Sequence, residues 1–203
     1  MSEVAEVLSA WNRIVRWLEA NAPVSAQALK PPATNEDIDR LNEYLGFEIP
    51  DVLDAWLRMN NGSTAKDSTA PISGGGMALI SHAGSLIFPD GEVFLGCEEI
   101  MRRHAEYLQI ASSIDDEDYW KRSWIPVVEK SDAPYGFLLD AERRGESAPV
   151  LRFGEGDYPE VCLPSLSGLL CPIADVLEHG EAAGSLMAYR RATVTDGRIE
   201  WAG

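Results

Sequence analysis

The residues of this chain that could do chemistry are three histidines, three cysteines and 33 carboxylates. None of the histidines, His82, His104 and His179, lies in an H-E-x-x-H or H-x-x-x-H arrangement, and no G-x-S-x-G turn presents a nucleophilic serine. A pair of carboxylates could hydrolyse glycosides, but in so acidic a chain no pair is distinguished by its spacing. The residue types therefore predict that the protein is not an enzyme.

Metal and phosphate sites are not indicated either. The cysteines Cys97, Cys162 and Cys171 form no C-x-x-C pair, so we expect reduced, buried thiols rather than disulfides or a zinc site. The acidic run at residues 115–118 lacks the glycine that a calcium-binding loop carries at its sixth position. The three glycines at residues 74–76 lack the lysine of a phosphate-binding loop. No metal and no cofactor is therefore expected.

Two short segments instead combine acidic and aromatic residues in a way that favours protein binding. One is the four-acid run with the two aromatic residues after it, and the other is a loop expected at residues 154–160. Carboxylates attract a basic partner, and aromatic side chains are enriched among residues that dominate binding energy. Two solvated loops without a partner are the alternative. The predicted contact residues are Asp115, Asp116, Glu117, Asp118, Tyr119, Trp120, Glu155, Asp157, Tyr158 and Glu160.

The overall charge restricts the kinds of partner. Seventeen basic residues against 33 acidic ones give a net charge of -16, which repels nucleic acids and anionic membranes, so neither is an expected ligand. The longest apolar runs, such as residues 77–80, are far shorter than the roughly 20 residues of a membrane span. Glu3 and Glu6 occupy the region where a secretory signal would be basic, so the sequence predicts a cytoplasmic protein.

Helical periodicity dominates the first half of the chain. Apolar residues recur at helical spacing over residues 3–20, which predicts an amphipathic helix. Thr34 and Asp37 form a near capping box before a second helix that should end at Gly46. Pro50 suits the start of a short helix, and an apolar stripe over residues 97–111 predicts another.

Strand patterns dominate the second half. Strands are expected at residues 77–80, 85–88, 124–129, 135–140 and 150–153, and the short connections between the last three predict antiparallel pairing. A last helix is expected over residues 166–177, with Pro172 kinking or delaying it, and Asp196-Gly197 predicts a terminal hairpin. Together these elements predict one α+β domain over residues 1–203, in which helices pack on a mainly antiparallel central sheet.

Several of these segments, in their order, carry a family resemblance. The chain resembles the SUKH superfamily, which includes yeast regulators of cell-wall glucan assembly and many bacterial immunity proteins. The likeness covers residues 28–180, leaving residues 1–27 as an N-terminal helical extension and residues 186–203 as a C-terminal hairpin. The segments that carry it are Pro31-Pro32-Ala33-Thr34, Leu45-Gly46, Ile49-Pro50, Asn61-Gly62, Trp124-Ile125-Pro126-Val127, Gly136 with Asp140, and the late helix around Leu166 to Leu177.

The resemblance implies a non-catalytic interaction fold. Bacterial members of the family commonly bind and neutralise a cognate toxin, often a nuclease. An acidic protein is suited to this role because it presents carboxylates where phosphates would lie in a basic cleft. We therefore expect an immunity protein that binds a basic toxin domain stoichiometrically. The alternative is a regulatory adaptor of the same fold that binds endogenous proteins in cell-wall or envelope control.

Overall fold

A five-stranded antiparallel sheet forms the centre of the fold, with its strands in the order β3-β4-β5-β6-β7. The computed structural model describes residues 2–64, 67–71, 77–81, 84–130, 133–142, 147–181 and 189–202. Each strand pairs with the next one along the chain, so β3 and β7 are the edges. The antiparallel pairing of β4, β5 and β6 is the one that their short connections predicted. The strands are β3 (Glu92–Phe94), β4 (Trp124–Lys130), β5 (Gly136–Asp140), β6 (Val150–Gly154) and β7 (Asp157–Leu163).

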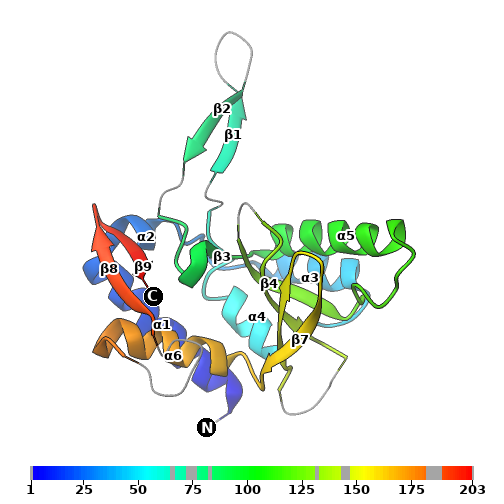
Figure 1. Cartoon of the computed structure of the whole chain (residues 1–203). Coiled ribbons are helices and arrows are strands. Elements are labelled where there is room, and N and C mark those ends of the chain that lie inside the picture. The colour runs from blue at the N-terminus through cyan, green and yellow to red at the C-terminus, as the bar shows by residue number, and fades with distance from the viewer. Residues whose placement is uncertain are drawn as a thin grey trace.

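Helices lie on both sides of this sheet, which confirms the predicted α+β class (Figure 1). α1 packs against α4 and α6, whereas α5 packs against α3 and β4. α6 runs through Pro172 as one helix and ends at Gly180, which has a left-handed backbone. The helices are α1 (Glu3–Asn21), α2 (Pro23–Gln27), α3 (Asn35–Leu45), α4 (Asp51–Leu57), α5 (Cys97–Ser113) and α6 (Ser167–His179), with one 3-10 turn, η1 (Pro89–Gly91).

Two further hairpins flank the sheet. β8 (Arg191–Thr195) and β9 (Arg198–Ala202) form the predicted terminal hairpin, which turns at Asp196 and Gly197 with positive φ. This hairpin contacts α2, and the amide of Val24 donates to the carbonyl of Gly197 at 2.9 Å. β1 (Asp67–Pro71) and β2 (Met77–Ser81) form a separate hairpin that stands away from the sheet in Figure 1. The sequence predicted β2 but not β1, because the polar composition of β1 gives no strand pattern. Residues 72–76 and His82 lie outside the described residues.

Two other predictions were wrong, one of a strand and one of a loop. Residues 85–88 do not form a strand, because the tight η1 turn brings the chain back at once and leaves Phe88 with only an isolated bridge to Glu92. The expected loop at residues 154–160 is mostly strand β7, because Gly156, with φ of 78°, closes a tight turn directly after β6. The second predicted contact segment is therefore held in a sheet edge.

The main core lies between the sheet, α1, α4 and α6. Its centre is aromatic: Trp56 stacks on Phe94 with ring centroids 3.8 Å apart, and Trp11 meets Trp56 edge-on at 5.3 Å. Trp11 also donates from Nε1 to Oδ1 of Asn60 at 2.9 Å, so its one polar atom is satisfied. A second, smaller cluster lies under α5 and consists of Tyr107, Ala111, Trp120, Trp124, Leu138, Leu151 and Phe153.

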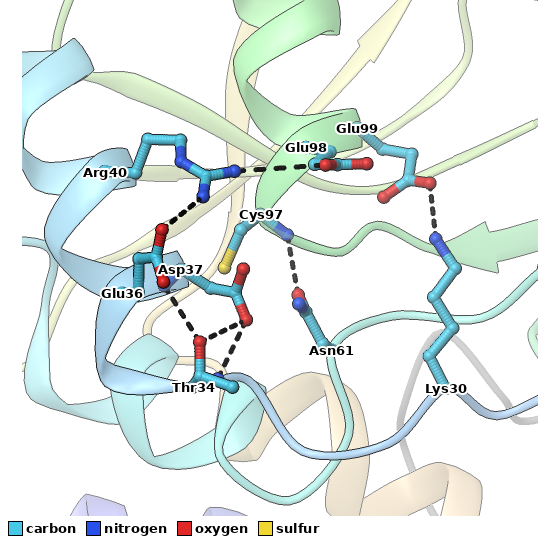
Figure 2. A network of polar contacts seen from close by, with 9 residues as sticks. All are labelled: Lys30, Thr34, Glu36, Asp37, Arg40, Asn61, Cys97, Glu98 and Glu99. Carbon is cyan, nitrogen blue, oxygen red and sulfur yellow. Dashed lines mark hydrogen bonds and ion pairs between the residues drawn. The ribbon is translucent and has the colours of Figure 1, made fainter.

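A polar network joins the start of α5 to α3 and to the segment that follows α4 (Figure 2). Thr34 Oγ1 accepts from the amide of Asp37, and the Asp37 carboxylate accepts from the amide of Thr34, which confirms the capping box. Asn61 Oδ1 accepts from the amide of Cys97 at 2.8 Å, and a side chain at Gly96 would clash with the Asn61 carbonyl oxygen at 2.2 Å. The first turn of α5 is therefore held rigidly, and its other end carries the acidic run.

Candidate protein-binding surface

The acidic run begins where α5 ends. Asp115 has a left-handed backbone with φ of 55°, which reverses the chain after the last helical turn. The amide of Asp116 then donates to the carbonyl of Ala111 at 3.0 Å, so a helix carbonyl that would lack a partner is satisfied. The amide of Asp118 donates to Oδ1 of Asp116, also at 3.0 Å. The four carboxylates are thus held in a defined turn at the end of α5.

Asp116 also joins the two predicted segments. Its Oδ2 accepts a 2.5 Å hydrogen bond from the hydroxyl of Tyr158 on β7, 42 positions further along the chain. This hydrogen bond raises the pKa of Tyr158. The rings of Tyr119 and Tyr158 meet edge-on with centroids 6.4 Å apart. The structure therefore brings together two segments that the sequence identified only separately.

Trp120 differs from the other predicted contact residues because it is buried. Only 3% of it is exposed, and its ring stacks on Tyr107 at 4.2 Å and meets Trp124 and Phe153 edge-on. An aromatic residue beside four acids suggested an exposed anchor, but the stack on α5 withdraws the indole into the core. Trp120 supports the surface from below and does not form part of it.

The remaining residues form what we call the acidic surface: residues 115–119 together with Glu155, Asp157, Tyr158 and Glu160. All are exposed except Asp116 and Tyr119, which are half-buried. Seven of them carry carboxylates, and the basic side chains of Lys121 and Arg122 follow in the chain. Two exposed apolar residues adjoin the acidic surface in sequence, Ile114 (52% exposed) and Val161 (51%). Sequence reasoning missed both, because each lies in a pattern that indicates only a helix end or a strand.

His104, which lies on α5, is fully buried in a structural role. Nε2 donates to the carbonyl of Arg122 at 3.0 Å, and Nδ1 is 3.1 Å from the hydroxyl of Tyr44. Burial lowers the pKa of His104, so the ring is neutral near neutral pH. His104 therefore ties α5 to α3 and to the segment after the acidic run.

Other kinds of site find little support in the described residues. No group of three or more His, Cys, Asp and Glu residues there is arranged to hold a metal ion. Within the same residues, no helix is long and apolar enough to cross a membrane. The three cysteines are unpaired thiols, with Cys97 buried and the other two half-buried.

Comparison with models of protein families identifies a family. The model of a family described as the SMI1 / KNR4 family (SUKH-1) matches residues 32–171, which is more than half of the chain. A search of curated proteins gives no match. The matched range runs from the loop before α3 into α6, so it contains the whole five-stranded sheet and every residue of the acidic surface.

Proposed function

Because this chain belongs to the SMI1 / KNR4 family (SUKH-1), we propose that it is a non-catalytic protein-binding domain that neutralises a toxin. In this proposal it is an immunity protein that binds a basic toxin domain stoichiometrically through the acidic surface. The observation that carries the proposal is the hydrogen bond between Tyr158 and Asp116, which joins two acidic segments into one exposed surface.

The chemistry of the acidic surface favours a basic partner. Its seven carboxylates lie on a protein with a net charge of -16, so the field around the molecule attracts positive charge. Such a field accelerates association and disfavours partners of like charge. The exposed ring of Tyr158 offers an amphipathic contact of the kind enriched among residues that dominate binding energy.

The proposal is tested with four proteins used as capture baits in lysate of the source organism. The first is the wild type, and the second carries D115N, D116N, E117Q and D118N. The third is a matched charge control that neutralises four exposed acids elsewhere, through E19Q, D39N, E43Q and E48Q. The fourth carries Tyr158→Phe, which removes the bond to Asp116. Captured proteins are identified by mass spectrometry, and their affinities are measured by calorimetry with purified protein.

We expect one basic partner at near one-to-one stoichiometry, and an affinity that falls by about tenfold or more when the first acidic set is neutralised. The control set should change the affinity by about twofold or less, because its four carboxylates do not belong to the acidic surface and act only through the overall charge, which salt screens. Equal losses of affinity in the acidic-run variant and in the charge control would mean that only the net charge of the protein matters. An unchanged affinity in the acidic-run variant would exclude the acidic surface as the binding site. Weak exchange among several envelope proteins would favour the adaptor alternative.

A further inference from the structure

A small pocket lies between α6, η1 and strands β3, β5 and β6. Its volume is about 160 Å³. A cavity of about 150 Å³ admits a molecule of roughly benzene's size. Its walls are apolar where Phe137, Leu169 and Ile173 line it, and polar where Glu92 and Arg152 do. The pocket is separate from the acidic surface, because none of its lining residues belongs to that surface.

Glu92 is the unusual member of this lining. It is only 2% exposed, and its Oε1 has no hydrogen-bond partner within the part of the chain that the structure describes. Burying a carboxyl group without a partner costs free energy, so burial raises the pKa of Glu92 to about 8. A buried carboxyl oxygen without a partner calls for an explanation, and here a pocket lies beside it.

Arg152 supplies the opposite charge without pairing with Glu92. Its guanidinium lies 5.2 Å from the centre of the Phe137 ring and forms no ion pair among the described residues. It still acts on Glu92, since it is the strongest of the charges that lower the pKa of that carboxyl. The other charged groups of the lining, Asp90 and Arg190, pair with each other at 2.8 Å. The pocket thus presents one carboxyl and one guanidinium that a ligand could bridge.

We propose that this pocket binds a small zwitterion, an α-amino acid with a short apolar side chain. The ligand's ammonium group donates to Glu92, and its carboxylate accepts from Arg152. The apolar side chain lies against Leu169 and Ile173 of α6. This arrangement gives the buried oxygen of Glu92 a donor and gives the exposed guanidinium of Arg152 a carboxylate partner, which an amine or a carboxylic acid alone could not do. The inference does not depend on the proposed function.

The test compares three ligands of matched shape with the full-length protein. L-valine carries both charged groups, isobutylamine lacks the carboxylate, and isovalerate lacks the ammonium. Binding is followed by isothermal calorimetry and by amide chemical shifts. We expect L-valine to bind with a Kd of about 0.1–1 mM, and each of the other ligands to bind at least about tenfold more weakly. Absence of saturable L-valine binding up to about 10 mM would overturn the proposal. Equal binding of isobutylamine would overturn the role of Arg152.

Variants then locate the site. Glu92→Gln and Arg152→Gln should each weaken L-valine binding by about tenfold or more. Glu129→Gln is the matched control, because Glu129 is equally buried but outside the pocket, and it should leave the affinity within about twofold. Circular dichroism checks that each variant folds. If Glu92→Gln or Arg152→Gln folds and binds L-valine as well as the wild type does, the assignment is overturned.

The affinity should also depend on pH with a defined sign. An ammonium group binds the ionised form of Glu92, whose pKa is about 8, so L-valine should bind more tightly as the pH rises from about 6.5 to 8.5. Arg152, Lys130 and Arg190 act to lower this pKa and Asp90 acts to raise it, while α6 lines the pocket without a titratable group. Glu92→Gln should abolish the pH dependence. A constant affinity in the wild type would contradict ligation by Glu92.

Discussion

Two buried glutamates on neighbouring strands have opposite surroundings. Glu92 on β3 is 2% exposed and Glu129 on β4 is 1% exposed. In the β3–β4 ladder Glu129 lies opposite Val93, the residue next to Glu92, so the two glutamates point to opposite faces of the sheet. Glu129 Oε1 accepts from the hydroxyl of Tyr107 at 3.0 Å and lies 3.2 Å from Nε of Arg103. Glu92 has no such neighbours within the described residues.

The difference between the partners of Glu92 and Glu129 indicates that the two buried carboxyls have different roles. Burial raises both pKa values, to about 8 for Glu92 and about 7 for Glu129. The lower value belongs to the glutamate that has a cation and a hydroxyl from its own chain. On the α5 face the protein supplies partners for Oε1 of Glu129, although Oε2 has no hydrogen-bond partner within the described residues, and the carboxyl helps to fix α5 on the sheet. On the α6 face the partner is missing and a pocket stands beside the carboxyl, which is the arrangement of a binding site.

The first prediction tests how closely the chain is packed around one glycine near each glutamate, Gly136 beside Glu129 and Gly168 beside the pocket of Glu92. A methyl group added at Gly136, which pairs with Glu129 across the β4–β5 ladder, would lie 2.0 Å from the carbonyl oxygen of Val128. One added at Gly168, which lines the pocket, meets nothing closer than 3.6 Å. We expect Gly136→Ala to lower the free energy of unfolding by about 3 kcal/mol. Gly168→Ala should leave it within about 0.5 kcal/mol, as measured by urea unfolding. Equal changes in the free energy of unfolding for the two variants would contradict this difference in packing.

The second prediction concerns the pH dependence of stability. A carboxyl whose pKa is raised in the folded state keeps its proton when the unfolded chain has already lost it. The free energy of unfolding therefore falls as the pH rises from the ordinary value of 4.5 to about 8 for Glu92 and to about 7 for Glu129, by up to about 1.4 kcal/mol per pH unit for each group. Glu92→Gln removes this penalty, so at about pH 8.5 the variant should be more stable than the wild type by about 2 kcal/mol. Toward pH 4.5 the gain should vanish.

The control for this prediction is the other glutamate. Glu129→Gln also removes a titrating carboxyl, but it takes away the charge that pairs with Arg103. We therefore expect a smaller gain than for Glu92→Gln at about pH 8.5, or a loss. Urea unfolding of both variants and the wild type between about pH 5 and 9 separates the two contributions. A larger gain at Glu129 would show that Arg103 and Tyr107 do not satisfy that carboxyl.

The third prediction removes the cation on each face. Arg103→Met leaves Glu129 buried without its ion pair, and we expect a loss of about 2 kcal/mol in the free energy of unfolding at about pH 8.5. The loss should shrink below about pH 6, because Glu129 is then protonated. Arg152→Met removes a guanidinium that forms no ion pair among the described residues, so it should cost less than about 1 kcal/mol. A pH-independent loss in Arg103→Met would indicate packing rather than charge.

Some features of this fold could be predicted from the sequence, and others could not. Local signals were read correctly: the capping box at Thr34 and the Asp196-Gly197 turn lie in the structure where the sequence put them. A three-residue strand such as β3 has too few side chains to show a period, so neither it nor the burial of Glu92 was predicted.

The candidate sites depend on contacts between distant positions. Tyr158 meets Asp116 across 42 residues, and the pocket around Glu92 draws Arg152 from β6 and its apolar wall from α6. Composition could identify acidic and aromatic segments, but it could not show which ones meet. It also could not show that Trp120 turns inward, since that follows from the stack on Tyr107 in another element. Fold class is therefore readable from local pattern, whereas sites need the tertiary contacts.

The fourth prediction has the smallest expected effect and concerns the hydrogen bond between Tyr107 and Glu129. Tyr107→Phe keeps the ring that stacks on Trp120 and removes only the hydroxyl that donates to Glu129. Since this hydrogen bond lowers the pKa of Glu129, the variant should raise that pKa above its value of about 7. We expect a loss of about 1 kcal/mol in the free energy of unfolding at about pH 8.5 and a smaller loss below pH 6. The carboxyl carbon shift of Glu129, followed by NMR across this range, reports the pKa directly. An unchanged pKa would mean that Arg103 alone distinguishes Glu129 from Glu92, and the hydroxyl would then have no part in the comparison.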